Sequence, residues 1–175
     1  MFDPLTPEVQ EALAISRWEA DRYRRNDIGP EHLLLALAQV HGQAARALQA
    51  LRIDEKALRA EIEKLIEPEK LPWRGRTPKR FPLTERSRKL LGTALKCAQV
   101  LQHRAVSDGH ILLGLLHIGE GVAYEALRNL SSKPDAVREA VLKHLASTGD
   151  GDDRGAKKGD IERMRRALEE NLPRD

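Results

Sequence analysis

The sequence has a single cysteine, Cys97, in its 175 residues. One thiol excludes an internal disulfide framework, and it also excludes metal sites that need four cysteine ligands. Because Cys97 falls beside the apolar stripe of a predicted helix, we interpret it as a small buried side chain and not as a nucleophile.

Aromatic residues make up only 3% of the chain, and no stretch alternates apolar and polar residues as a half-buried strand does. No apolar run approaches the roughly 20 residues that a membrane-spanning helix needs. The first ten residues, MFDPLTPEVQ, lack the pattern of a secretory signal. These absences predict an all-α protein of the cytoplasm that does not enter a membrane.

The positive charge is small and local. The formal net charge is +3, and residues 67–82 hold five basic and two acidic side chains. A nucleic-acid-binding domain usually carries a basic stripe along a folded face, so this footprint is weak. We keep one alternative open: a regulator that binds nucleic acid through this connector, where Trp73 and Phe81 stand among the basic residues and could stack on bases.

What the sequence does contain is a repeat. A shift of 78 residues superposes IGPEHLLLAL (28–37) on VSDGHILLGL (106–115), and a shift of 79 superposes the stretches that follow. One inserted residue in a loop explains the change of shift. Self-similarity of this kind, over about 70 residues, indicates a duplicated structural unit.

Each copy predicts four helices. In the first copy, Thr6 and Pro7 mark a helix start, and apolar residues recur every three or four positions up to Arg25. In the second copy, helices are predicted over 84–102, 107–118, 121–130 and 134–146. The fold class is therefore all-α: an eight-helix, pseudo-twofold bundle of two four-helix repeats. The repeats span 1–66 and 83–147, with the basic, proline-rich connector 67–82 between them.

The remaining residues divide into a linker and a short helix. Residues 148–159 are charged and rich in glycine, which is typical of a flexible linker. In the segment 160–175, Ile161, Met164, Leu168 and Leu172 form a narrow apolar stripe. An isolated helix of this length is marginal in water, so we expect it to dock on the body, on a second copy as a homodimer, or on a partner.

Both copies resemble the N-terminal domain of Clp-family ATPases, of the ClpC type. The resemblance rests on the order helix, turn, (I/V)-G-x-E-H-(I/L)-L-L-x-L and G-x-A-x-x-x-L. It is also carried by TERSRKLL, LQH and HILLGLLHIGEGVAYEAL in the second copy. It covers residues 3–146 and implies a non-catalytic domain that receives substrates and adaptor proteins.

No G-x-x-x-x-G-K-(S/T) phosphate loop occurs in these residues, and no Ser-His-Asp or paired-carboxylate arrangement stands out. We therefore predict a free-standing Clp N-domain that is not an enzyme and has no cofactor and no metal. The implied partners are Clp ATPase or protease components with their substrates and adaptors, and the role is delivery or competition as a decoy. Sequestration of cyclic peptide antibiotics is an alternative, because such compounds target the resembled domains.

The resemblance further implies recognition of phosphorylated arginine, with one site in each repeat. A guanidinium pairs with a carboxylate, and a phosphate binds hydroxyls and helix N-terminal amides. By position, Thr6 and Glu31 belong to the first repeat and Thr84 to the second. The first repeat departs from the family's usual threonine at Pro30.

In the second repeat, Gly109 stands where the glutamate is expected. Loss of a hydrogen bond to a charged group costs about 1.5–3 kcal/mol, or about ten- to a hundredfold in affinity. Asp108 precedes Gly109, but adjacent helical positions point about 100° apart. We therefore expect a first site that binds and a second site that is severely weakened.

His32 and His110 each begin an apolar helix, once per repeat, with no second ligand at metal-binding spacing in the same turn. His103, His110 and His117 are spaced seven apart, but a turn near Asp108 interrupts them. We predict structural histidines that hydrogen-bond across the helix start.

Overall fold

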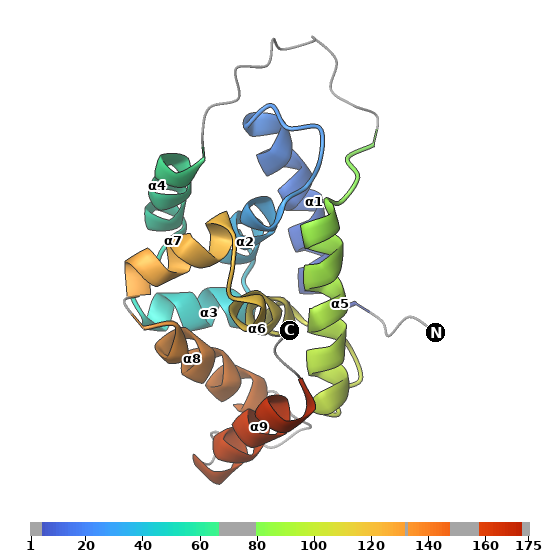
Figure 1. Cartoon of the computed structure of the whole chain (residues 1–175), viewed down its shortest axis with the longest axis vertical. Helices are drawn as coiled ribbons and strands as arrows, with labels where there is room; N and C mark the ends of the chain where they lie inside the picture. The colour runs from blue at the N-terminus through green and yellow to red at the C-terminus, as the bar shows by residue number, and fades with distance from the viewer. Residues whose placement is uncertain (1–4, 67–79, 132, 148–157, 173–175) are drawn as a thin grey trace.

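The computed structural model describes residues 5–66, 80–131, 133–147 and 158–172. Within these residues the chain forms nine α-helices and no extended strand (Figure 1), which confirms the all-α prediction. The first copy provides α1 (Pro7–Arg22), α2 (Pro30–Gln39), α3 (Gln43–Ala50) and α4 (Glu55–Leu65). The second provides α5 (Glu85–Val100), α6 (Asp108–Ile118), α7 (Val122–Ser131) and α8 (Pro134–Ser147), and α9 (Lys158–Asn171) follows. Most of the predicted connector, with Trp73, and most of the predicted linker lie outside the described residues.

Two isolated β-bridges reveal the pseudo-twofold relation. Leu5 pairs with Val106, and Ile28 pairs with Leu83. A shift of 78 residues carries Leu5 onto Leu83 and Ile28 onto Val106, so each bridge is the image of the other. The third and fourth helices of the two repeats also pack across the repeats: α3 packs on α8, and α4 packs on α7. The two repeats therefore interlock and do not fold as separate bodies side by side.

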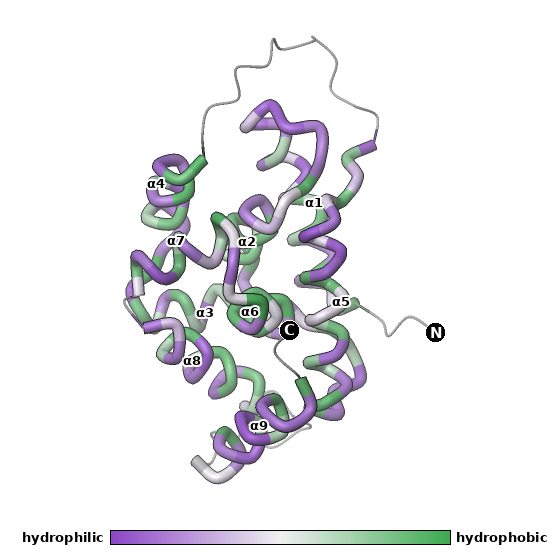
Figure 2. The backbone as a smooth tube through the Cα atoms, viewed as in Figure 1, coloured by the Kyte–Doolittle hydropathy of each residue, from purple (hydrophilic) through white to green (hydrophobic). Residues whose placement is uncertain are grey.

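The core is centred on α2 and α6. Six consecutive residues of α2, from His32 to Leu37, are buried, and so are nine of α6, from Asp108 to Leu116. A helix that is buried all round needs the apolar sequence that both copies contain. The outer helices α4, α8 and α9 mix polar and apolar residues along their length (Figure 2), as expected for helices with one inward face.

The C-terminal helix docks on the body. It begins at Lys158, packs on α5 and α8, and leaves Leu172 only 5% exposed. Ile161, Met164 and Leu168 pack against the core cluster. Arg165 forms an ion pair with Glu139 of α8. Of the three docking places expected from the sequence, this structure therefore uses the domain's own surface.

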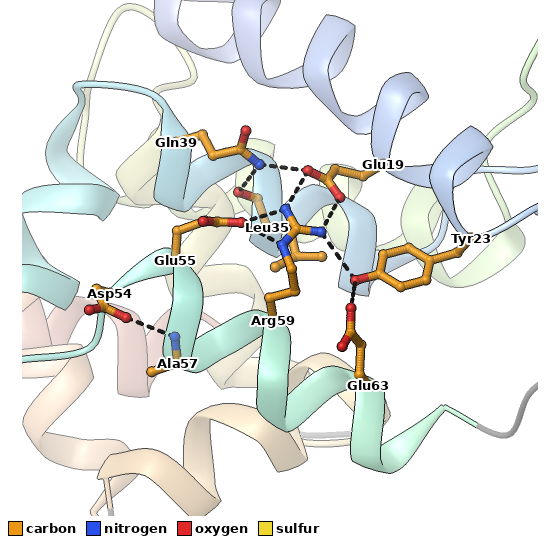
Figure 3. A network of polar contacts seen from close by, with 9 residues as sticks. All are labelled: Glu19, Tyr23, Leu35, Gln39, Asp54, Glu55, Ala57, Arg59 and Glu63. Carbon is orange, nitrogen blue, oxygen red and sulfur yellow. Dashed lines mark hydrogen bonds and ion pairs between the residues drawn. The ribbon is translucent and has the colours of Figure 1, made fainter.

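A polar network joins α1, α2 and α4 in the first repeat (Figure 3). The two terminal nitrogens of Arg59 each donate to a different oxygen of Glu19 at 2.8 Å. Arg59 Nε donates to Glu55 at 2.7 Å, Arg59 Nη1 donates to the Tyr23 hydroxyl at 3.1 Å, and Gln39 donates to Glu19 at 2.8 Å. The Arg59 guanidinium thus satisfies a buried carboxylate from forty residues away in the chain.

Candidate functional site

The start of α5 lies against the turn that leads into α2. The Thr84 amide donates to the Ile28 carbonyl at 3.0 Å, and the Ser87 hydroxyl donates to the same carbonyl at 2.7 Å. Glu31 follows three residues after Ile28, in the first turn of α2. The structure therefore brings Glu31 of the first repeat to the first turn of α5, in the second repeat.

The pseudo-twofold equivalent of this contact is found at the start of α1. The Thr6 amide donates to the Val106 carbonyl at 3.0 Å, which places the start of α1 beside the turn that leads to Gly109. The start of the first helix in each repeat thus lies against a turn of the other repeat. The resemblance paired Thr6 with Glu31 inside one repeat, whereas the structure pairs Thr84 with the Glu31 turn.

The two threonine hydroxyls, of Thr6 and Thr84, differ in their hydrogen bonding. Thr84 Oγ1 accepts from the Ser87 amide at 3.1 Å and contacts the Ser87 hydroxyl at the same distance, so Thr84 caps α5. Thr6 occupies the N-cap position of α1, at the predicted helix start, but its side chain makes no capping hydrogen bond. The third residue of α1 is Val9, which has no hydroxyl to hold the threonine in place. Among the described residues, Thr6 Oγ1 is buried without a hydrogen-bond partner.

Glu31 lines a small recess of about 120 Å³ together with Arg86 and Lys89 of α5. Its side chain is 20% exposed, and His32 Nε2 lies 4.0 Å from its carboxylate. Burial lowers the pKa of His32, so that ring is neutral at physiological pH and does not neutralise Glu31. Glu120 also lines the recess. The recess therefore offers two exposed cationic side chains beside the Glu31 carboxylate, with Glu120 as a second acidic group.

The equivalent positions at the start of α1 and α6 carry the reverse charge pattern. The 78-residue shift puts Glu8 at the place of Arg86, Glu11 at the place of Lys89, and Gly109 at the place of Glu31. Glu8 lies close enough to Asp108 to help raise the pKa of that carboxyl. The second copy of this arrangement has therefore lost the carboxylate and has acidic groups where the first has basic ones.

The Asp108 carboxylate has a structural role. Its carboxylate accepts from the Ala44 amide at 2.7 Å, across 64 residues, and the residue is 1% exposed. Burial raises its pKa, although backbone hydrogen bonds partly oppose that rise. Asp108 thus satisfies the first turn of α3 and presents no free carboxylate to a ligand.

Gly109 is a packing position. A Cβ at this residue would lie 2.9 Å from Gln43 Oε1 and 3.0 Å from Leu145 Cδ2, whereas a Cβ at Gly92 on α5 would meet nothing within 4 Å. We expect Gly109→Ala to lower the free energy of unfolding by about 1–3 kcal/mol through overpacking. Gly92→Ala, at an exposed helical position, should raise it by about 0.5–1 kcal/mol. Urea unfolding of both variants measures the difference, and equal effects would contradict the assignment.

The histidines act within the fold, as the sequence predicted. His32 Nδ1 accepts from the Gly29 amide, and His110 Nδ1 accepts from the Ser107 amide, both at 2.9 Å. The sequence did not predict the 2.8 Å hydrogen bond between His103 Nδ1 and His110 Nε2. Within the described part of the chain, no three His, Cys, Asp or Glu side chains gather as a metal site would require.

Cys97 is 1% exposed, and burial raises the pKa of its thiol to about 12. A nucleophilic cysteine needs a thiolate, so the prediction of a buried structural side chain is confirmed. No helix among the described residues is both long and apolar enough to cross a membrane.

Sequence reasoning missed Arg86 and Lys89. They stand three residues apart at the start of α5, which puts them on one face of the helix. Their signal was present in the repeat alignment, because a basic pair in one copy replaces an acidic pair in the other. Only the exchange of helix starts between repeats places that pair beside Glu31.

The sequence is similar to regions of curated Clp proteins. It is 39% identical over 148 residues to the chaperone protein ClpB of Oceanobacillus iheyensis, covering 84% of this chain and 18% of that protein. It is 38% identical over 153 residues to the negative regulator of genetic competence ClpC/MecB of Bacillus subtilis, covering 86% and 18%. The chain thus spans less than a fifth of the length of these relatives.

Solved structures share the fold. The N-terminal domain of the chaperone ClpD from Arabidopsis thaliana superposes with a TM-score of 0.63 at 18% identity, over 83% of this chain and 96% of that one. The Hsp104 N-terminal domain from Candida albicans gives 0.67 at 16% identity, over 88% and 99%. The model of the Clp repeat (R) N-terminal domain matches residues 4–72 and 82–170. Since those matches take in most of both repeats, the chain belongs to the Clp repeat (R) N-terminal domain family.

Proposed function

We propose that this domain is a non-catalytic module that receives protein chains, and that its Glu31 recess recognises phosphorylated arginine on them. The observation that carries the proposal is the placement of Arg86 and Lys89 with Glu31 around one recess. The carboxylate suits the guanidinium of the ligand, and the two cations suit its phosphoryl group. A ligand that carries both groups is complementary to both halves of the recess.

The charge difference between the two copies supports a single strong site. Beside Gly109, Glu8 and Glu11 replace the basic pair and would repel a phosphoryl group, and no glutamate is present to hold the guanidinium. Binding of one phosphoarginine per chain is therefore expected.

The biological role that we propose is to present marked proteins to a Clp protease system as an adaptor, or to compete for them as a decoy. The two roles differ in whether the domain contacts an ATPase. A pull-down with Clp ATPase distinguishes them, since an adaptor binds the ATPase and its cargo together, whereas a decoy binds the cargo alone.

We expect Glu31→Gln to weaken binding of free phosphoarginine about ten- to a hundredfold, because a hydrogen bond between charged groups contributes about 1.5–3 kcal/mol. Isothermal titration calorimetry measures the affinity and the stoichiometry. Glu8→Gln, at the position of α1 that corresponds to Arg86, is the matched control and should leave this binding unchanged. Unmodified arginine and inorganic phosphate each carry half of the ligand and should bind more weakly. Two equal sites, or unchanged affinity in the Glu31 variant, would refute the proposal.

A further inference from the structure

The network around Arg59 has a counterpart position for each member in the second repeat. The 79-residue shift places Arg59 on Arg138. Both helices follow the same core register, because Leu58 and Val137, one residue earlier, are each fully buried. The arginine is therefore present in both copies at the same place on the fourth helix.

The partners of that arginine are not kept. Glu19 is replaced by Cys97 and Tyr23 by Leu101 under the 78-residue shift, and Glu55 is replaced by Pro134 under the 79-residue shift. Two carboxylates and one hydroxyl have been lost together. An arginine whose partners have all been replaced is left with donors that nothing in its own repeat satisfies.

The surroundings of Arg138 in the fold differ from those of Arg59 in the same way. Arg138 is half-buried and lies near enough to Cys97 to act on the thiol electrostatically, as Arg59 lies beside Glu19 in the first repeat. Within the described residues, the guanidinium of Arg138 makes no hydrogen bond and no ion pair. Arg59, by contrast, donates to Glu19, to Glu55 and to Tyr23.

Open space surrounds Arg138. Two recesses of about 570 Å³ and about 270 Å³ share Arg138, His117 and Leu172 as lining residues, and so they adjoin. The smaller one reaches Cys97, at the place that corresponds to Glu19. Together they form a cavity between α5, α8, the end of α6 and the docked α9, which we call the Arg138 cavity.

The cavity is suited to a single negative charge. The larger recess is lined by three basic residues, Lys89, Lys96 and Arg138, and by two acidic residues, Glu120 and Asp135. The net charge of these side chains is therefore +1. A carboxylate matches that balance, whereas the two acidic groups disfavour a phosphate dianion. Apolar side chains complete the wall: Leu116, Ile118, Tyr124 and Leu172.

We propose that the Arg138 cavity is a second peptide-binding site, which takes an aspartate or glutamate side chain flanked by apolar residues. The carboxylate of the bound peptide supplies to Arg138 the forked hydrogen bonds that Glu19 supplies to Arg59. The neighbouring apolar side chains of the peptide contact the apolar wall. This site shares Lys89, Ile118 and Glu120 with the Glu31 recess, but Glu31 itself does not line it, so binding of the acidic peptide does not require the Glu31 carboxylate.

The test is a titration of the ¹⁵N-labelled full chain, followed by NMR, with the peptide acetyl-Leu-Glu-Leu-Leu-amide. We expect shifts of the Arg138 Nε–Hε resonance and of amides in α5 and α8. The matched peptide acetyl-Leu-Gln-Leu-Leu-amide should bind at least tenfold more weakly, and Arg138→Gln should weaken the acidic peptide at least tenfold. Inorganic phosphate at the same concentration should leave the Arg138 Nε–Hε resonance and the amides of α8 in place.

A variant of the cavity itself sharpens the test. Cys97→Glu supplies a carboxylate within the chain, at the place that Glu19 occupies in the first repeat, and should abolish binding of the acidic peptide. Cys97→Ala is its control and should retain binding, as should Glu31→Gln, which disables only the phosphoarginine recess. Equal binding of the two peptides, or an Arg138→Gln variant that binds as the wild type does, would overturn the proposal even if Cys97→Glu fails to fold. A shift of the Arg138 Nε–Hε resonance with phosphate that equals its shift with the acidic peptide would also overturn the proposal.

Discussion

Replacing Arg59 with alanine is expected to lower the free energy of unfolding by about 3–5 kcal/mol, because the substitution leaves a buried carboxylate without its counter-charge. Glu19 is 5% exposed. Burial alone raises the pKa of Glu19, but the hydrogen bonds from Arg59 and Gln39 outweigh that effect and hold the pKa below its usual range. The Glu19 side chain is thus charged at neutral pH only because the network supplies those donors.

The size of this effect separates a buried pair from a surface pair. An exposed ion pair contributes about 0–1 kcal/mol, and Lys64 with Glu61, where the lysine is 73% exposed, is such a pair on the same helix. Lys64→Ala is therefore the matched control, with an expected loss below about 1 kcal/mol. Chemical unfolding of both variants at pH 7 gives the comparison, and a loss of less than 1 kcal/mol in Arg59→Ala would show that Glu19 finds water or another donor.

Glu19→Gln should cost less than Arg59→Ala. In that variant Arg59 keeps its hydrogen bonds to Glu55 and to the Tyr23 hydroxyl, and no charge is left buried alone. A double-mutant cycle with the two substitutions should give a coupling energy of about 0.5–3 kcal/mol, as for residues in direct contact.

The helices could be predicted from the sequence because their signals are local. Apolar residues at threes and fours, Pro7 at a helix start and Gly42 at a helix break each act within a few residues. The burial of α2 could also be predicted, because a helix that is apolar nearly all round is stable only inside the core. The duplication then carried the same prediction to α6.

The packing between repeats could not be predicted in the same way. The hydrogen bond from the Ala44 amide to Asp108 spans 64 residues, and the ion pair of Glu19 with Arg59 spans 40. Contacts at such separation leave no periodic trace in one sequence. The repeat alignment indicated two equivalent units, but it could not show that the third and fourth helices of each unit pack on those of the other.

The candidate site illustrates the same limit. Glu31 was identified from a short motif, and Gly109 from its absence in the second copy. Arg86 and Lys89 lie in the other repeat, 55 or more residues along the chain. Their relation to Glu31 depends on the hydrogen bond from the Thr84 amide to the Ile28 carbonyl, which only the folded arrangement reveals.

Acid should unfold this domain through His110. Burial lowers the pKa of His110 to about 3, and the nearby His103 lowers it further in the same direction. In the unfolded chain a histidine has a pKa of about 6.5. Between those values the unfolded state binds a proton that the folded state does not, so stability is complete above about pH 6.5 and falls as the pH drops. The expected slope from this residue is about 1.4 kcal/mol per pH unit, and the full loss near pH 3 is about 4–5 kcal/mol.

His110→Asn removes the titrating ring and keeps an acceptor for the Ser107 amide, because an asparagine Oδ1 can stand where the histidine Nδ1 accepts at 2.9 Å. The variant should lose some stability at pH 7, since its contact with His103 is gone, but its stability should fall less steeply between pH 6 and pH 4. Asp108 acts in the opposite sense: its pKa is raised in the folded state, so its protonation on acidification favours folding. A titration of the His110 ring by NMR gives the direct measurement. A midpoint near 6.5 in the folded protein would contradict the assignment, because a ring buried between the Ser107 amide and His103 has no room to carry a solvated charge.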